Sequence, residues 1–145
     1  IRIGSPDQDS EKQVLDRPSS LHPAEELQPV LTAQDVLDLQ STVEKVRLED
    51  SLLDYLLAIV TETRRSDLLT LGVSPRGAVS LSRAAKALAL IRGRQYCLPD
   101  DIKELAPIVL AHRVVLHKNH AAPGRHSQDA EQVIRDILES IPVPL

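Results

Sequence analysis

Apolar residues recur along this chain at the three-to-four-residue spacing of amphipathic helices, and no clear two-residue alternation of strands accompanies them. The pattern predicts main helices over residues 32–46, 50–65, 75–92, 99–113 and about 128–140. A shorter helix is expected between Pro6 and Arg17. Since the core would consist of Leu, Ile, Val and Ala with few glycines, the fold class is predicted to be all-α.

Each expected helix has an apolar face that we expect to be buried. In the short first helix, Val14 and Leu15 are expected to make the apolar contacts. In the longer helices the positions expected to be buried are Val36, Leu37, Leu39, Val43 and Val46; Leu52, Leu53, Leu56, Ile59 and Val60, with Tyr55 near the edge; Leu81, Ala84, Ala85, Leu88 and Ile91; and Val133, Ile134, Ile137 and Leu138.

Helix boundaries are marked by local chemistry. Thr32, followed by Asp35 at the third helical position, predicts a capped helix start. Ser74 is a good N-cap, and Pro75 suits the first helical position because its missing N–H is not needed there. Gly93 is expected to end the central helix in a left-handed conformation.

Prolines shape the remaining segments. Pro107 cannot donate to the carbonyl four residues earlier, so we expect a kink or break just before it. Leu98 is a poor N-cap, although Pro99 and the acids Asp100 and Asp101 suit a helix start. Residues 18–31 contain three prolines and no periodicity, which predicts an extended linker. Residues 1–3 read as the end of a strand without a partner, and 121–127 as a mobile loop.

Charge sets the central helix apart from the rest of the chain. The formal net charge is −4, yet no acid lies between Ser74 and Arg94, a stretch whose basic residues are Arg76, Arg83, Lys86, Arg92 and Arg94. A helix start disfavours a cation and favours an anion, so Arg76 in the first turn suits a site where a phosphate docks. A solvated surface arginine is the alternative. For Arg64 and Arg65, a favourable charge at a helix end is preferred over a ligand contact.

Composition excludes several function classes. The acidic balance and the near-absence of aromatic residues oppose nucleic-acid binding. One cysteine, Cys97, allows no intrachain disulfide and is expected to be a small core residue in a cytoplasmic protein. No apolar run is long enough to insert into a membrane, and the spacing of His112, His117, His120 and His126 fits no metal motif.

The chain also lacks recognisable catalytic machinery. It contains no GxxxxGK[ST] stretch to cradle a triphosphate and no apolar strand ending in paired acids to hold Mg²⁺. It contains no methionine, so we expect it to be a fragment. The residues alone predict a helical module with one phosphate-ready helix start.

Five ordered motifs carry a resemblance to a known family. They are Leu71-Gly-Val-Ser-Pro-Arg-Gly, Arg83-Ala-Ala-Lys-Ala-Leu-Ala, Gly93-Arg-Gln-Tyr, Pro99-Asp-Asp-Ile and Val109-Leu-Ala-His-Arg. In this order they resemble the C-terminal lid of MoxR-type AAA+ ATPases, and Arg2-Ile-Gly-Ser-Pro resembles the segment that leaves the ATPase core. The resemblance implies a small helical bundle of the lid type at residues 32–145, preceded at 1–31 by an extended segment from the core and a linker.

The resemblance also implies a function. Arg76 would be the second-sensor arginine that reaches the γ-phosphate of ATP, with Ser74 and Pro75 beside it in the nucleotide-binding turn. ATP and Mg²⁺ would be held mainly by an upstream core outside this chain, whose motifs carry out hydrolysis. Members of the family form rings, commonly hexamers, and act like chaperones on partner complexes that often carry von Willebrand factor A domains.

The sequence departs from the family pattern at a few positions. The family usually has alanine where Val73 and Gly77 stand, and threonine where Leu98 stands. Glycine in a helical turn is less favourable than alanine by about 1 kcal/mol, so the helix entry is expected to be looser. A free-standing helical adaptor that binds a protein partner through the alanine-rich helix is the alternative function.

Overall fold

The computed structural model describes residues 6–16, 27–117 and 126–144, with only the backbone of 126 and 127. The chain divides into two compact units, Ile1–Leu37 and Asp38–Leu145. The expectations for residues 1–3, for most of the linker and for the loop at 121–127 lie outside the described residues. The expected division of the chain at residues 31 and 32 stays a prediction.

The first unit contains helix α1 (Gln8–Leu15) and the beginning of α2 (Ala33–Lys45). The carboxylate of Asp7 caps α1 by accepting a hydrogen bond of 2.8 Å from the N–H of Ser10. None of the residues of α1 is buried, and Val14 and Leu15 are exposed. The expectation that these two side chains make buried contacts is therefore wrong.

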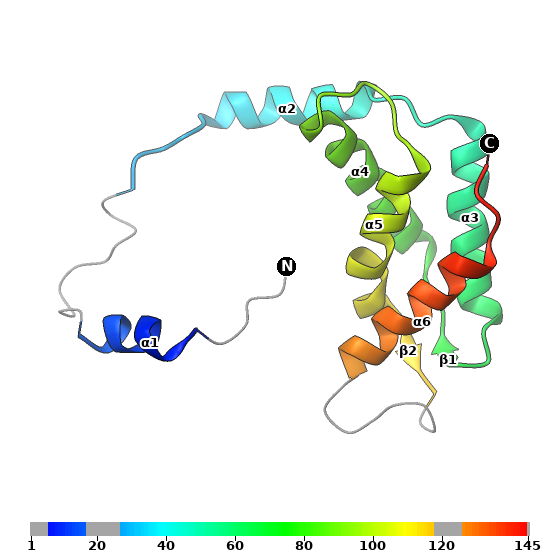
Figure 1. Ribbon diagram of the computed structural model, residues 1–145. Coiled ribbons are helices and arrows are strands. Elements are labelled where there is room, and N and C mark those ends of the chain that lie inside the picture. Colours follow the sequence, from blue (N-terminus) through cyan, green and yellow to red (C-terminus); the bar gives the residue numbers. More distant parts are fainter. Residues whose placement is uncertain (1–5, 17–26, 118–125, 145) are drawn as a thin grey trace. The chain divides into compact units, whose positions relative to one another are not determined.

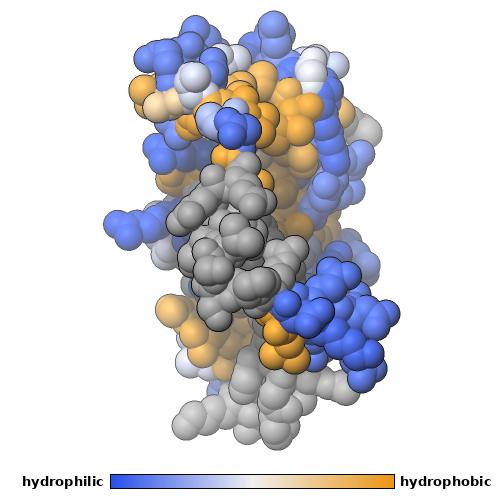
Figure 2. Space-filling model, turned by 90° about the vertical axis from the view of Figure 1, so that its left-hand side faces the viewer, coloured by the Kyte–Doolittle hydropathy of each residue, from blue (hydrophilic) through white to orange (hydrophobic). Residues whose placement is uncertain are grey.

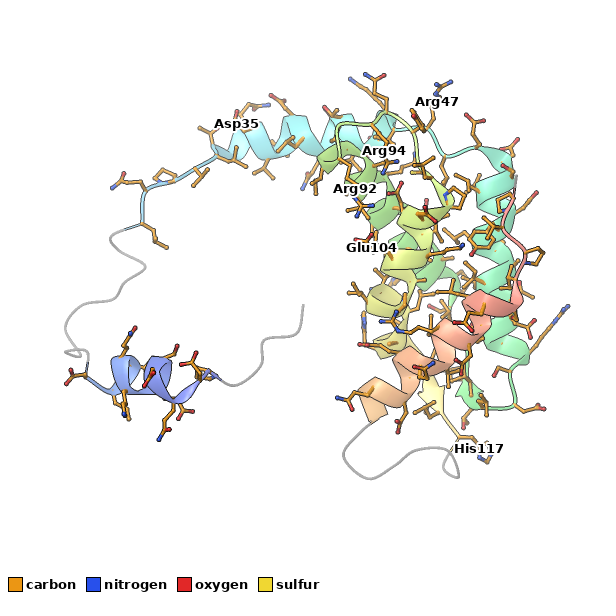
Figure 3. The ribbon with its side chains drawn as sticks, viewed as in Figure 1. Asp35, Arg47, Arg92, Arg94, Glu104 and His117 are labelled. Carbon is orange, nitrogen blue, oxygen red and sulfur yellow. The ribbon has the colours of Figure 1, made fainter. Side chains whose placement is uncertain are left out.

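The start of α2 follows the predicted capping. The Asp35 carboxylate accepts from the N–H of Thr32 at 2.8 Å, and the Thr32 hydroxyl accepts from the N–H of Asp35 at 3.1 Å. Asp35 lies near the start of α2 (Figure 3). Of the predicted apolar face, Val46 is buried just after α2, but the side chains of Val36, Leu37 and Leu39 are exposed, contrary to the prediction. An amphipathic pattern indicates that one face of a helix is suited to burial, but the surface that buries this face need not belong to the same chain.

The second unit contains the rest of α2 and the helices α3 (Asp50–Arg65), α4 (Pro75–Ile91), α5 (Pro99–Leu110) and α6 (His126–Ser140), which form a bundle (Figure 1). Helix α5 packs against both α4 and α6, and α3 contacts the same two helices. Its largest fully buried side chains include Ile59, Leu81, Ile102, Leu110 and Ile134. The predicted all-α class is confirmed.

The buried face of α4 is narrower than predicted. Leu81 and Ala85 are fully buried as expected, but Ile91 is 82% exposed. The buried positions are Gly77, Leu81, Ala85 and Ala89, which lie four residues apart. Such a row is one ridge of a helix, and its small side chains allow neighbouring helices to approach closely. On α3, Leu53 is exposed although it was expected to be buried, and Tyr55, which was expected near the edge of the buried face, is buried.

Two short strands complete the unit. Strand β1 (Leu69–Leu71) pairs with β2 (Val115–Leu116) in an antiparallel ladder, with Leu69 opposite Leu116. Sequence reasoning missed both strands because two or three residues are too few to show an alternating pattern. The ladder ties the segment before α4 to the segment after α5.

Helix α5 continues through Pro107 to Leu110 and is followed by a 3₁₀ turn, Ala111–Arg113. Of the expected kink or break before Pro107, the break is therefore wrong, and the kink stays a prediction. The proline ring is fully buried, so its packing offsets the backbone hydrogen bond that proline cannot make.

The glycine at the end of α4 was predicted correctly. Gly93 has φ +72°, in the left-handed region. Its N–H donates to the carbonyl of Leu90, and the N–H of Arg94 donates to that of Ala89, each at 2.9 Å. These paired bonds form a Schellman motif and satisfy carbonyls that the helix end would otherwise leave free.

None of the described helices is both long and apolar enough to cross a membrane.

Candidate functional site

The candidate site is the first turn of α4. Ser74 lies at the N-cap in extended conformation, and its hydroxyl accepts a 3.4 Å hydrogen bond from the N–H of Gly77. Pro75 occupies the first helical position, as predicted. This turn contains no acidic residue, so nothing in it neutralises the partial positive charge of the helix start.

Arg76 places a positive charge in this turn. Its side chain is exposed, and its guanidinium has no hydrogen bond or ion pair with any residue that the structure describes. Only its backbone carbonyl is engaged, by the hydroxyl of Ser80 at 3.0 Å. An arginine without a partner, beside the positive end of a helix, can donate hydrogen bonds to an anion such as a phosphate.

The last turn of α3 holds the segment that leads into α4. The N–H of Val73 donates to the Thr63 hydroxyl at 3.0 Å, and that hydroxyl donates to the carbonyl of Val60 at 2.6 Å. The Nε of Arg64 donates to the carbonyl of Val73 at 2.8 Å. Arg64 was expected to act through its charge at the helix end, and the structure gives its side chain this specific contact as well.

Glycines make the close packing around this entry feasible. A Cβ on Gly72 would lie 2.7 Å from the backbone of Thr63 and Arg64. A Cβ on Gly77 would lie 2.5 Å from Cγ1 of Val73 and 3.5 Å from Cδ of Arg113. Gly77 therefore does not simply loosen the helix start, because the larger Val73 occupies the space that an alanine side chain would need.

Two of the basic residues of the central stretch stabilise the fold at the other end of α4. Arg94 binds both carboxylate oxygens of Asp101, at 2.8 and 2.6 Å. Arg92 lies near the same carboxylate at 3.2 Å and pairs with Glu104 at 2.7 Å (Figure 3). Because this cluster is internally paired, Arg92 and Arg94 are not available as phosphate ligands.

Asp101 was expected to be a helix-start charge, and it is also a buried centre of this cluster. Its side chain is 1% exposed, and its carboxylate accepts from the N–H of Leu98 at 2.8 Å. Leu98 itself has no side-chain acceptor, so only this half of a capping box exists. Burial acts to raise the pKa of Asp101, but hydrogen bonds from Arg94 and Leu98 and the arginine charges outweigh it and lower the pKa.

A groove lies alongside α4. It has a volume of about 880 Å³ and is formed by α2, α3 and α4. Its lining residues include Val43, Leu53, Leu57 and Val79, with Arg83 among the polar ones. Exposed hydrophobic residues also gather at the surface in the upper part of Figure 2. Sequence reasoning missed this groove because it predicted that Leu53 is buried.

The remaining candidates show no chemistry of their own. Cys97 is buried, as predicted, and burial raises the pKa of its thiol. His112 and His117 are exposed, whereas His120 and the side chain of His126 lie outside the described residues. Within residues 6–16, 27–117 and 126–144, no three metal-ligating side chains form a cluster that would hold an ion.

Comparison with known proteins identifies the fold family. The AAA lid domain family matches residues 61–137, more than half of the chain. The uncharacterized protein YeaC of Bacillus subtilis is 41% identical over 145 residues, which is 100% of this chain and 44% of YeaC. The chaperone MoxR1 of Mycobacterium tuberculosis is 31% identical over 99% of this chain and 39% of its own length.

A solved structure supports the same family assignment. A candidate ATPase from Cytophaga hutchinsonii superimposes with a TM-score of 0.80 at 31% identity, over 100% of this chain and 46% of that chain. The chain thus spans less than half the length of these relatives. This chain belongs to the AAA lid domain family and is of the MoxR type, which confirms the resemblance drawn from its motifs.

Proposed function

We propose that this chain is the nucleotide-sensing lid of a longer AAA+ ATPase and that Arg76 is its second-sensor arginine. The observation that carries the proposal is the free guanidinium of Arg76 on the first turn of α4, in a chain that belongs to a lid family. Ser74 and Pro75 fix the turn, and Arg76 extends from it toward the γ-phosphate.

The described residues fit part of an ATP site only. They supply one guanidinium at a helix start that carries no acid, which suits a phosphate oxygen. ATP with Mg²⁺ supplies the phosphoanhydride bond, and both would be held mainly by the upstream core. What the lid contributes is a positive charge that stabilises the negative charge on the γ-phosphate.

We further propose that the full protein forms a ring, commonly a hexamer, in the cytoplasm and acts in a chaperone-like way on partner complexes, including ones with von Willebrand factor A domains. The Mycobacterium tuberculosis relative is named a chaperone, which supports the general role. The exposed apolar residues Val36, Leu37 and Leu39 of α2 support the need for a neighbouring surface, either the core or the next subunit.

Steady-state ATPase assays on the full-length protein test the sensor role. A guanidinium about 4 Å from a phosphate charge gains up to roughly 4 kcal/mol at an effective dielectric near 20, before desolvation is subtracted. Part of that acts equally on bound ATP and on the transition state, so we expect Arg76→Ala to slow hydrolysis by about 10- to 100-fold. Arg76→Lys should restore only part of the rate, because lysine keeps the charge and loses the planar fork.

Arg135→Ala is a matched control, because Arg135 is exposed on α6 and has no partner among the described residues. The melting temperature should stay unchanged in all three variants, since none of these side chains supports the fold. A wild-type rate for Arg76→Ala would remove the sensor role. A large loss of melting temperature would make Arg76 a structural residue instead.

The groove between α2, α3 and α4 favours the second candidate, a helical adaptor that binds a protein partner. The two functions are distinguished by the sequence that precedes residue 1 in the full-length protein. A phosphate-binding GxxxxGK[ST] stretch there supports the lid. A full-length protein without one would support the adaptor.

A further inference from the structure

Both backbone polar groups of a single residue, Val73, are bound by the last turn of α3. The Thr63 hydroxyl accepts from its N–H at 3.0 Å, and Nε of Arg64 donates to its carbonyl at 2.8 Å. Thr63 and Val73 are fully buried, and the Thr63 hydroxyl also donates to the carbonyl of Val60 at 2.6 Å. The hydroxyl is therefore fixed in direction, since its proton is already engaged.

This arrangement determines where α4 begins. Val73 directly precedes the N-cap Ser74, and Arg76 follows within the first turn. Gly72 lies so close to the backbone of Thr63 and Arg64 that a Cβ there would be 2.7 Å away. The end of α3 thus holds the chain immediately before the helix from its two backbone hydrogen-bonding groups and by direct contact.

We propose that Thr63 and Arg64 are positioning residues for Arg76: they fix the start of α4 so that its guanidinium meets the γ-phosphate. The inference rests on the proposed sensor function and adds to it two residues that do not touch nucleotide. If the start of α4 shifts, the guanidinium of Arg76 shifts with it. A small displacement of a charged group from its productive position lowers the rate of catalysis strongly.

A purely structural role would produce a different pattern of activity. If Thr63 and Arg64 only stabilised the fold, their loss would slow hydrolysis equally with or without Arg76. If they act through Arg76, their loss matters only while Arg76 is present. The double-mutant cycle between Arg64→Ala and Arg76→Ala therefore separates the two roles.

The experiment measures kcat and KM for ATP in the full-length protein for Arg64→Ala, Arg76→Ala and the double variant. We expect Arg64→Ala to lower kcat by about 3- to 30-fold, not more than Arg76→Ala does. The double variant should be no slower than Arg76→Ala. Arg65→Ala is the matched control, because it removes an adjacent, exposed arginine that does not bond Val73, and it should leave kcat unchanged.

Conservative variants test the individual hydrogen bonds. Thr63→Ser keeps the hydroxyl and should retain most of the rate, whereas Thr63→Val keeps the shape, loses the hydroxyl and should slow hydrolysis as Arg64→Ala does. Arg64→Lys retains one donor and should recover part of the rate.

Failure of the positioning role can be distinguished from failure of the sensor role. If Arg76→Ala is slow but Arg64→Ala has a wild-type kcat, or if the two losses multiply in the double variant, the positioning role is overturned and the sensor role stands. If Arg76→Ala itself has a wild-type rate, the proposed function fails, and the positioning role fails with it.

Discussion

The contact between Val73 and Gly77 yields a quantitative prediction about the start of α4. Replacing Gly77 with alanine in an ordinary helix would stabilise the protein by about 1 kcal/mol. Here the new Cβ would lie 2.5 Å from Cγ1 of Val73, a stiff, fully buried side chain. Overpacking of this kind costs about 1–3 kcal/mol, so Gly77→Ala should lower the free energy of unfolding by about 1 kcal/mol.

Removing the obstruction should reverse the effect. Val73→Ala alone deletes two buried methyl groups and should cost about 2–3 kcal/mol, including the space left behind. In the double variant, the alanine at 77 fills part of that space and adds its helix propensity. We expect the double variant to lie within about 1 kcal/mol of the wild type, a coupling of about 2 kcal/mol between the two positions.

Urea unfolding of the chain, followed by far-ultraviolet circular dichroism, measures these differences. Gly72→Ala provides the control, because its Cβ would lie 2.7 Å from backbone atoms of α3, which Val73→Ala does not remove. Its destabilisation should persist when Val73→Ala is added. A stabilised Gly77→Ala, or additive losses in the double variant, would refute the reasoning that Val73 and Gly77 are a matched pair.

Three further predictions concern the rest of the chain. Gly93→Ala should lower the free energy of unfolding by about 1–2 kcal/mol, because φ +72° strains any side chain although no atom lies within 4 Å of the new Cβ; Gly93→Asn should lose less in the same urea assay. The lowered pKa of Asp101 means that its contribution to stability is present above the usual aspartate value of 3.8 and is lost as the pH falls through the folded-state pKa. Asp101→Asn should therefore lower the free energy of unfolding by about 3 kcal/mol near neutral pH and weaken its dependence on acid pH. An unchanged pH profile of stability would show that Asp101 is not the source of the acid dependence. The isolated chain should show no magnesium-dependent release of phosphate from ATP, because its sequence contains no GxxxxGK[ST] stretch, and turnover that survives repurification would contradict the lid function.

Helix boundaries could be predicted from the sequence because they depend on nearby residues. The pairing of Thr32 with Asp35, the Ser74 cap and the left-handed Gly93 each involve groups within about five positions. The turn that carries Arg76 was found for the same reason.

Burial and long-range contacts could not be predicted in the same way. Ile91 and Leu53 lie at helical spacing, yet Ile91 is 82% exposed and Leu53 is 38% exposed, because burial depends on how far other elements cover a position. The bonds from Thr63 and Arg64 to Val73 join residues nine and ten positions apart, and no periodicity marks them. Among the contacts around the start of α4, only the one between the larger Val73 and the smaller Gly77 is reflected in the sequence, because both positions depart from the alanine that is usual in the family.

The central claim is that Arg76 reads the γ-phosphate, and the most direct test is the difference between ATP and ADP binding. The measurement is the Kd of the full-length protein for a nonhydrolysable ATP analogue and for ADP, in wild type and in Arg76→Ala. If Arg76 contacts the γ-phosphate, the variant should bind the ATP analogue about 10-fold more weakly, equivalent to about 1.4 kcal/mol, and bind ADP as the wild type does. Equal losses for both nucleotides, or no loss for either, would contradict the account.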